Sequence, residues 1–215
     1  TRRSPSKRLG DPFRRASIIG KGGTVSPIAS VEGVFAQGPN ALTVDGRPTL
    51  EHIDFALMDS YRFPDDNGFP GSYRAFIRHA GWARTFGLWL IYPPVLPGFA
   101  DGWQGRARNL TAHLHSVYRE GQDDEFDWMI EPDGDWSLPD SLQVFGWSEN
   151  GDALLWDTAS RGTDGEFPVW ESRSFNSLHR LGGSLYEALP SIRTRTASLF
   201  GPRTFDIEPL QPNAL

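Results

Sequence analysis

The stretch that decides the fold reads LQVFGW (142–147), SENGD (148–152) and ALLWDT (153–158). Two apolar runs are joined by an Asn-Gly pair, which is a strong short-range signal for a β-hairpin. In the first run, Val144 and Gly146 are expected on one face of the strand, and Phe145 and Trp147 on the other. The second run is apolar from Leu154 to Trp156 and therefore suits a strand near the middle of a sheet.

Downstream of the hairpin, the pattern predicts one more strand and a closing helix. Phe167-Pro168-Val169-Trp170 reads as a short strand, which Pro168 would place at the edge of the sheet. The helix is predicted from the spacing of Leu178, Leu181, Leu185 and Leu189. Gly182 and Gly183 would lie inside it and cost about 0.5–1 kcal/mol each relative to alanine, so packing would have to hold it.

Upstream of the hairpin, periodicity predicts three helices and a strand. The first helix runs from Leu50 to Tyr61 with Thr49 as its N-cap, and the second is opened by Phe69-Pro70-Gly71-Ser72 and closed by Gly81. A strand follows over residues 85–92, ended by Pro93-Pro94, and the third helix covers Gln104 to Arg119. We therefore divide the chain into a Gly/Pro-rich tail (1–48), a domain (49–190) and a C-terminal extension along the surface (191–215), in which Ile192–Thr196 is a candidate edge strand.

Composition excludes several classes of protein. The 215 residues are 38% hydrophobic, which is enough for a core in one domain. No apolar run approaches the roughly 18 residues of a membrane span, and no signal-peptide stretch opens the chain, so we expect no membrane contact. The chain has no cysteine, which excludes disulfides and thiolate metal sites and fits a cytoplasmic location.

Charge is distributed unevenly along the chain. Residues 1–27 carry seven Lys or Arg and one Asp, so the net charge of −6 leaves −12 on the remainder. The remainder is therefore distinctly acidic. Such a field favours basic partners and repels nucleic acid, so we expect no specific nucleic-acid binding.

Motifs of known chemistry are absent or out of context. Ile18-Ile19-Gly20-Lys21-Gly22-Gly23 resembles a nucleic-acid-clamping GxxG loop, but prolines stand where the flanking helices should be, and the P-loop spacing is missing. His113 and His115 cannot chelate together from one helix, and Asp133-Gly134-Asp135 lacks the rest of a calcium loop. No G-x-S-x-G elbow or singled-out carboxylate pair is present. We expect no enzyme activity, no cofactor and no metal.

The main functional clue is an acidic run from Glu120 to Asp140, which contains nine carboxylates, two tryptophans and no lysine or arginine. A solvated loop that keeps the domain soluble would have the same composition, and this reading stays open. As a binding surface, the run offers charges for steering and aromatic anchors; Trp103, Trp128 and Trp136 lie in polar loops, whereas Trp147, Trp156 and Trp170 fall within strands and suit a core. The candidate partner-binding residues are Asp123, Asp124, Glu125, Asp127, Trp128, Glu131, Asp133, Asp135 and Trp136, with Glu149 and Asp152 at the hairpin turn as a second group.

The succession of elements resembles the SUKH superfamily over roughly residues 50–190. The helix entry Phe69-Pro70-x-x-Tyr73-Arg74-x-Phe76 with its closing Gly81, the strand at 86–92, Leu138-Pro139-x-x-Leu142-x-Val144-Phe145-Gly146, the aromatic-Asp pair Trp156-Asp157 and the Pro168-Val169 strand are similar to that family's pattern. None of these motifs is catalytic. The resemblance implies an α+β fold: a single domain with a twisted, mostly antiparallel sheet, helices packed against it and extended tails.

Many bacterial SUKH members are immunity proteins that neutralise a toxin domain, often a nuclease or deaminase. The resemblance therefore implies a non-catalytic protein that occludes the basic active-site surface of a toxin. The alternative is a scaffold or assembly component, in which the basic tail and the proline-containing C-terminus dock on a partner complex.

Overall fold

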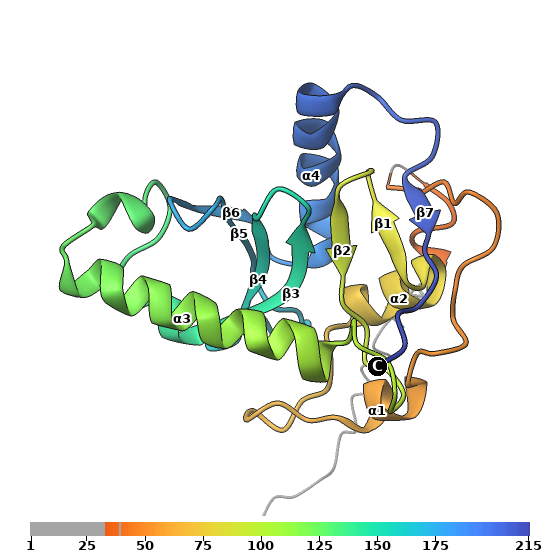
Figure 1. The fold of residues 1–215 in the computed structure, drawn as a ribbon, viewed down its shortest axis with the longest axis horizontal. Coiled ribbons are helices and arrows are strands. Elements are labelled where there is room, and N and C mark those ends of the chain that lie inside the picture. The colour runs from red at the N-terminus through yellow and green to blue at the C-terminus, as the bar shows by residue number, and fades with distance from the viewer. Residues whose placement is uncertain (1–32, 39) are drawn as a thin grey trace, which may run out of the picture.

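The computed structural model describes residues 33–38 and 40–215 (Figure 1). A seven-stranded antiparallel sheet forms its centre, in the order β6-β5-β4-β3-β2-β1-β7. Four α-helices pack around this sheet, so the α+β fold expected from the sequence is confirmed. The strands are β1 (Ala83–Thr85), β2 (Trp89–Ile91), β3 (Leu142–Ser148), β4 (Ala153–Asp157), β5 (Val169–Ser172), β6 (Leu178–Gly182) and β7 (Ile207–Pro209); the helices are α1 (Phe55–Ser60), α2 (Gly71–Ala80), α3 (Arg108–Asp123) and α4 (Leu185–Phe200).

The predicted hairpin is confirmed as β3 and β4, with Gly151 in the turn at a φ of 91°. All five residues of β4 are buried, and β4 lies between β3 and β5. The predicted alternation along β3 is wrong beyond Val144, because the pairing register shifts between Val144 and Gly146. This bulge puts Phe145 and Gly146 on the same face of the sheet, where a side chain on Gly146 would meet Ile91 and Leu154.

Two predictions downstream of the hairpin are wrong. β5 pairs with both β4 and β6, so it is an interior strand, and Pro168 directly precedes it without interrupting its ladder. Leu178 and Leu181 belong to the edge strand β6 and not to a helix. The helix begins at Leu185, after β6 has ended at Gly182 and the chain has turned at Gly183, and Ser184 caps it by accepting a hydrogen bond from the Glu187 amide.

The N-terminal half differs from the predictions mainly at the ends of elements. The first helix is shorter than predicted, because α1 begins at Phe55 with Asp54 as its cap, and α2 ends at Gly81 as predicted. The single strand predicted over residues 85–92 is two short strands joined by a turn at Phe86 and Gly87, both with positive φ. The third helix is confirmed, but it runs on to Asp123 and follows a π-helical turn at Trp103–Ala107.

The C-terminal residues belong to the fold. Ile192–Thr196 lies within α4, so the predicted edge strand is wrong, and the expected boundary at residue 190 falls inside this helix. The chain then returns to add β7 beside β1. Upstream of residue 49, Phe35 and Leu42 are buried in the core. The basic segment 1–27 and its glycine-containing loop, Ile18–Gly23, lie outside the described residues.

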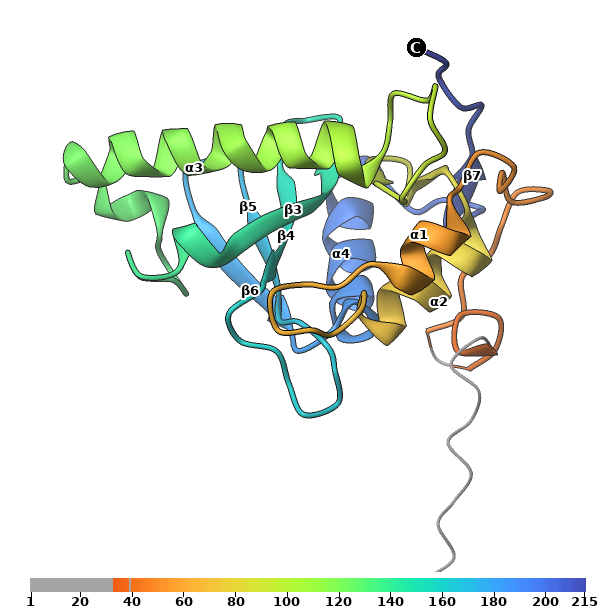
Figure 2. The same cartoon turned by 90° about the horizontal axis from the view of Figure 1, so that it is seen from below.

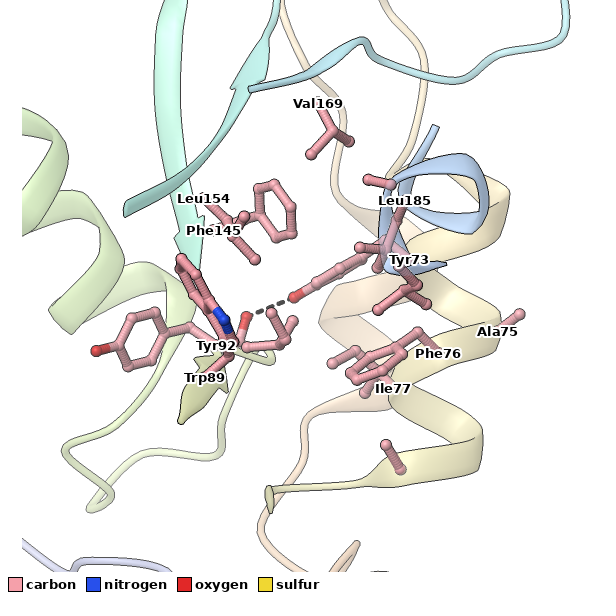
Figure 3. Close-up of a cluster of buried hydrophobic side chains, with 14 of the residues drawn as sticks. Tyr73, Ala75, Phe76, Ile77, Trp89, Tyr92, Phe145, Leu154, Val169 and Leu185 are labelled. Atoms are coloured by element: carbon pink, nitrogen blue, oxygen red, sulfur yellow. Dashed lines mark hydrogen bonds between the residues drawn. The ribbon is translucent and has the colours of Figure 1, made fainter. Parts of the chain in front are cut away.

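The sheet separates two hydrophobic cores. Leu154 and Trp156 of β4 face the larger core, with α2 and α4, whereas Ala153 and Leu155 face a smaller one that contains Leu114 and Tyr118 of α3. Figure 2 shows α3 lying across the sheet apart from the other three helices. In the larger core, the Tyr73 hydroxyl donates a hydrogen bond of 2.5 Å to the Tyr92 carbonyl (Figure 3). Side chains that alternate along β4 therefore pack against helices on both faces of the sheet.

Candidate protein-binding surface

The acidic run lies at the C-terminal end of α3 and in the loop that follows it. We call residues 123–136 the acidic tip. Figure 1 shows this segment projecting from the side of the molecule opposite to β1 and β7. The seven carboxylate residues predicted in this segment are all exposed; they are Asp123, Asp124, Glu125, Asp127, Glu131, Asp133 and Asp135.

Two apolar residues anchor the tip to the smaller core. After α3 ends at Asp123, Glu125 takes a positive φ of 59° and a short 3₁₀ turn begins at Asp127. Met129 and Ile130 are buried beside Tyr118. The anchor also explains why Gly121 is a glycine, since a Cβ there would collide with the Met129 sulfur. The backbone of the tip is therefore held in place while its carboxylates face solvent.

An exposed aromatic pair stands among these carboxylates. The rings of Phe126 and Trp128 stack with a centroid distance of 4.4 Å and an interplanar angle of 26°. Phe126 is 36% exposed and Trp128 is 50% exposed. Phe126 was not among the predicted site residues, although its position two residues before Trp128 in an acidic run was a usable signal. Exposed aromatic rings of this size are typical anchors in protein interfaces.

The carboxylates of the tip fall into two groups. The side chains of Asp123, Asp124, Glu125 and Glu131 make no hydrogen bond or ion pair with any residue in the described part of the chain. The other three have structural partners: Asp127 accepts the Trp136 indole N–H at 2.7 Å, and Asp133 accepts the Arg180 backbone N–H at 3.0 Å. Two hydrogen bonds from Ser137 lower the pKa of Asp135. Trp136 is half-buried against the smaller core and so serves the structure of the tip.

The charges of α3 oppose its dipole. The helix has no acidic residue in its first turn and no basic residue in its last turn, where Asp123 and the cap residue Asp124 stand instead. A helix C-terminus carries partial negative charge, so carboxylates there are repelled. The free carboxylates at this end therefore reduce the stability of the helix that carries them.

The second predicted group does not offer free carboxylates. Glu149 accepts two hydrogen bonds from Arg84, at 2.7 and 2.9 Å. Asp152 is 6% exposed, forms an ion pair with Arg195 at 3.1 Å and accepts the Ser174 backbone N–H. The structure places Asp152 in the interior. Trp103, the remaining tryptophan considered for an interface, is also buried, as a π-helical turn carries it into the larger core.

Comparison of the chain with protein-family models, with curated proteins and with solved structures found no match. Among the residues that the structure describes, no group of three or more His, Asp or Glu side chains is arranged to hold a metal ion. No helix in the described ranges combines the length and the apolar character needed to cross a membrane.

Proposed function

We propose that this protein is a non-catalytic binding domain that docks a basic protein partner on its acidic tip. The observation that carries the proposal is the stacked, exposed pair Phe126–Trp128, surrounded by carboxylates that the described residues leave unpaired. The charges would accelerate association with a basic surface, and the two rings would supply buried area once the complex forms.

The class of partner follows from the SUKH resemblance and from the sign of the charge. A toxin domain that cleaves or deaminates nucleic acid presents a basic groove to its substrate, and an acidic protrusion can fill that groove. We therefore propose immunity by occlusion, with a nuclease or deaminase toxin domain as the partner and the cytoplasm as the compartment. The partner and the compartment rest on resemblance, charge and composition, whereas the docking surface rests on geometry.

A capture experiment with matched variants tests the proposal. The wild-type chain, the double variant Asp123→Lys/Asp124→Lys and the control Asp45→Lys/Glu51→Lys would each be used as bait in native cytoplasm. The control makes the same change in net charge at two exposed positions outside the tip, in the segment whose Asp45 backbone N–H donates to the Ile207 carbonyl of β7. We expect the wild type and the control to retain the same basic protein and the tip variant to lose it.

Kinetics of the captured pair make the test sharper. If the tip steers association, the association rate constant falls about tenfold or more with added salt, and the tip variant loses most of this dependence. Equal retention of a partner by the tip variant and the wild type would refute the docking surface. An acidic or non-enzymatic partner would refute the toxin assignment.

The scaffold alternative finds less support in the described residues. It uses the basic N-terminal tail, which lies outside the described residues, and a free C-terminal arm to reach a neighbouring protein. Residues 191–200 instead complete α4, and Ile207–Pro209 forms β7 within the sheet. The Arg193 side chain further ties α4 to this return segment through an ion pair of 2.8 Å with Asp206.

A further inference from the structure

His52 is a buried histidine that the proposed docking surface does not use. Its side chain is 2% exposed, and its ring lies against the ring of Phe99 with a centroid distance of 5.3 Å. The Nδ1 atom is buried and has no hydrogen-bond partner among the residues that the structure describes. A buried polar atom without a partner lowers stability, and a leucine in the same place would avoid this loss. Packing alone therefore does not account for a histidine here.

A loop folds over this ring. The His52 carbonyl accepts the backbone N–H of Leu96 at 2.9 Å, so the chain around Leu96 lies beside the segment that carries the histidine. The chain then turns and carries Phe99 onto the imidazole. We call residues 96–101 the covering loop. The burial of His52 depends on this loop, because the loop supplies the ring that packs against it.

Residues 213–215 hold the covering loop in place, and we call them the C-terminal strap. The Ala100 N–H donates to the Asn213 carbonyl at 2.9 Å, and the Leu215 N–H donates to the Gly98 carbonyl at 2.8 Å. Figure 1 shows the C-terminal end of the chain beside this loop. These contacts are few and do not belong to the sheet, so the loop can open while the sheet stays folded.

Two carboxylates act on His52, one from its own segment and one from the covering loop. Glu51 precedes the histidine in the chain, and Asp101 accepts a hydrogen bond from the Asn213 side-chain amide. The strap itself carries no charged side chain. Burial lowers the pKa of His52 below its ordinary value, although both carboxylates act in the opposite direction. The closed loop therefore favours the neutral imidazole.

We propose that His52 is a pH-sensitive latch, whose protonation in mildly acidic solution opens the covering loop and releases the C-terminal strap. An imidazolium against Phe99 would be a buried charge with an unpaired Nδ1–H, whereas both ring nitrogens are hydrated once the loop is open. A movement of Asp101 towards the positive ring would also loosen the strap, because the Asn213 amide would lose its acceptor. Opening uncovers the rings of His52 and Phe99.

Two protonation equilibria fix the direction of the pH effect. A histidine in the open loop titrates near pH 6.5, whereas the closed loop resists protonation until the pH is lower. The closed form is therefore fully favoured above about pH 7 and becomes less favoured as the pH falls through about 6.5. One proton changes the opening equilibrium constant by at most about tenfold per pH unit, so we expect an increase of about five- to tenfold from pH 7.5 to pH 5.5.

Amide hydrogen exchange of the ¹⁵N-labelled full-length chain at pH 7.5 and pH 5.5 measures the opening. After correction for the intrinsic exchange rate at each pH, the protection factors of the Ala100 and Leu215 amides should fall about five- to tenfold at pH 5.5, while those of β4 stay unchanged. His52→Leu removes the titrating group and should give the same protection at both pH values. His113→Gln changes an exposed histidine of α3 and is the control, which should keep the wild-type response.

An NMR titration of the His52 ring tests the proposal without a substitution, in case the leucine variant does not fold. The ring should titrate with a midpoint below about pH 6.5. A midpoint at or above this value, or equal protection of Ala100 and Leu215 at the two pH values in the wild type, would overturn the proposal. A fall of the same size in His52→Leu would overturn it too, and so would a matching loss of protection throughout β4, which would mean general unfolding in acid.

Discussion

Tyr118 holds α3 to the sheet through its hydroxyl group as well as its ring. The hydroxyl lies 2.9 Å from the Ser172 hydroxyl of β5 and donates to the Met129 carbonyl at 3.3 Å, below the acidic tip. Burial raises the pKa of Tyr118 to about 12. This residue therefore links the stability of the smaller core to pH in the alkaline range.

Replacing Tyr118 by phenylalanine should have opposite effects at neutral and alkaline pH. At pH 7, the loss of the hydrogen bonds should lower the free energy of unfolding by about 1 kcal/mol. The folded chain holds the Tyr118 proton more tightly than the unfolded chain. The protonated hydroxyl therefore stabilises the wild-type fold fully below pH 10, and this stabilisation is lost as pH rises towards 12. The loss due to Tyr118 amounts to about 2–3 kcal/mol, and the variant should not show it.

Urea unfolding of both chains at pH 7, 10 and 11 measures this difference. The gap in stability between wild type and Tyr118→Phe should narrow above pH 10. A gap that stays constant from pH 7 to pH 11 would show that Tyr118 titrates at its ordinary value in the folded chain.

Arg195 neutralises two buried carboxylates at once. It forms ion pairs with Glu171 and with Asp152, and Arg173 adds a further contact to Glu171 at 3.0 Å. Glu171 is only 2% exposed. Burial raises its pKa although Arg195 and Arg173 act in the opposite direction. The cluster joins the β3–β4 turn, β5 and α4, so it holds three parts of the fold together.

We predict that Arg195→Met lowers the free energy of unfolding at pH 7 by about 3 kcal/mol, because it leaves buried charges without their partner. The raised pKa of Glu171 means that the folded form of the variant gains stability as pH falls and the carboxyl group takes up a proton. The loss relative to wild type should therefore be smaller at pH 5 than at pH 7. Arg180→Met, at an exposed position of β6, is the control and should change stability little at either pH.

At the scale of whole elements, the charges at the C-terminal end of α3 reduce the stability of the helix that carries them. Its last turn and cap carry exposed carboxylates that the helix dipole disfavours. Each charge placed favourably at a helix end contributes about 0.3–1 kcal/mol. A helix selected only for stability would carry lysine or arginine there.

Asp123→Lys/Asp124→Lys should therefore raise the melting temperature while it weakens partner binding. The control Asp45→Lys/Glu51→Lys makes the same change in charge away from α3, and it separates the dipole effect from relief of general repulsion in an acidic domain. Thermal unfolding at low salt measures both variants. A tip variant that melts below the wild type would mean that these carboxylates support the loop structure, and the argument from the dipole would fail.

How much of each element could be predicted depended on whether its cues were local. The β3–β4 hairpin and α2 were predictable, because the Asn-Gly turn and the Gly81 cap lie within the segments they define. The start of α4 is marked by Gly182, Gly183 and Ser184, but leucines of β6 and α4 follow one helical spacing and so predict a helix that begins too early. Pro168 predicts an edge strand for β5, but it stands one residue before the ladder and not within it, so it does not exclude an interior position.

For the candidate site, the exposure of the acidic tip could be predicted from composition, but the ion pairs of the second group could not. Exposure of the acidic tip follows from its polarity, and every predicted carboxylate of the tip is exposed. The burial of Asp152 could not be inferred, because it depends on Arg195, which lies 43 residues further along the chain.

At the scale of the molecule, β7 forms one edge of the sheet through contacts between distant parts of the chain. Its three residues pair with β1, and Ile207 is fully buried in the larger core.

We predict that a chain ending after Phe200 loses about 3 kcal/mol or more of unfolding free energy, because burial of Ile207 and the Arg193–Asp206 ion pair disappear while the β1 edge opens. A chain ending after Gln211 keeps β7 and is the control. Urea unfolding and light scattering of both chains make the comparison, and we expect the shorter one to unfold at lower urea and to aggregate. If both truncated chains unfolded like the full-length protein, residues 201–215 would be an extension that the domain does not need.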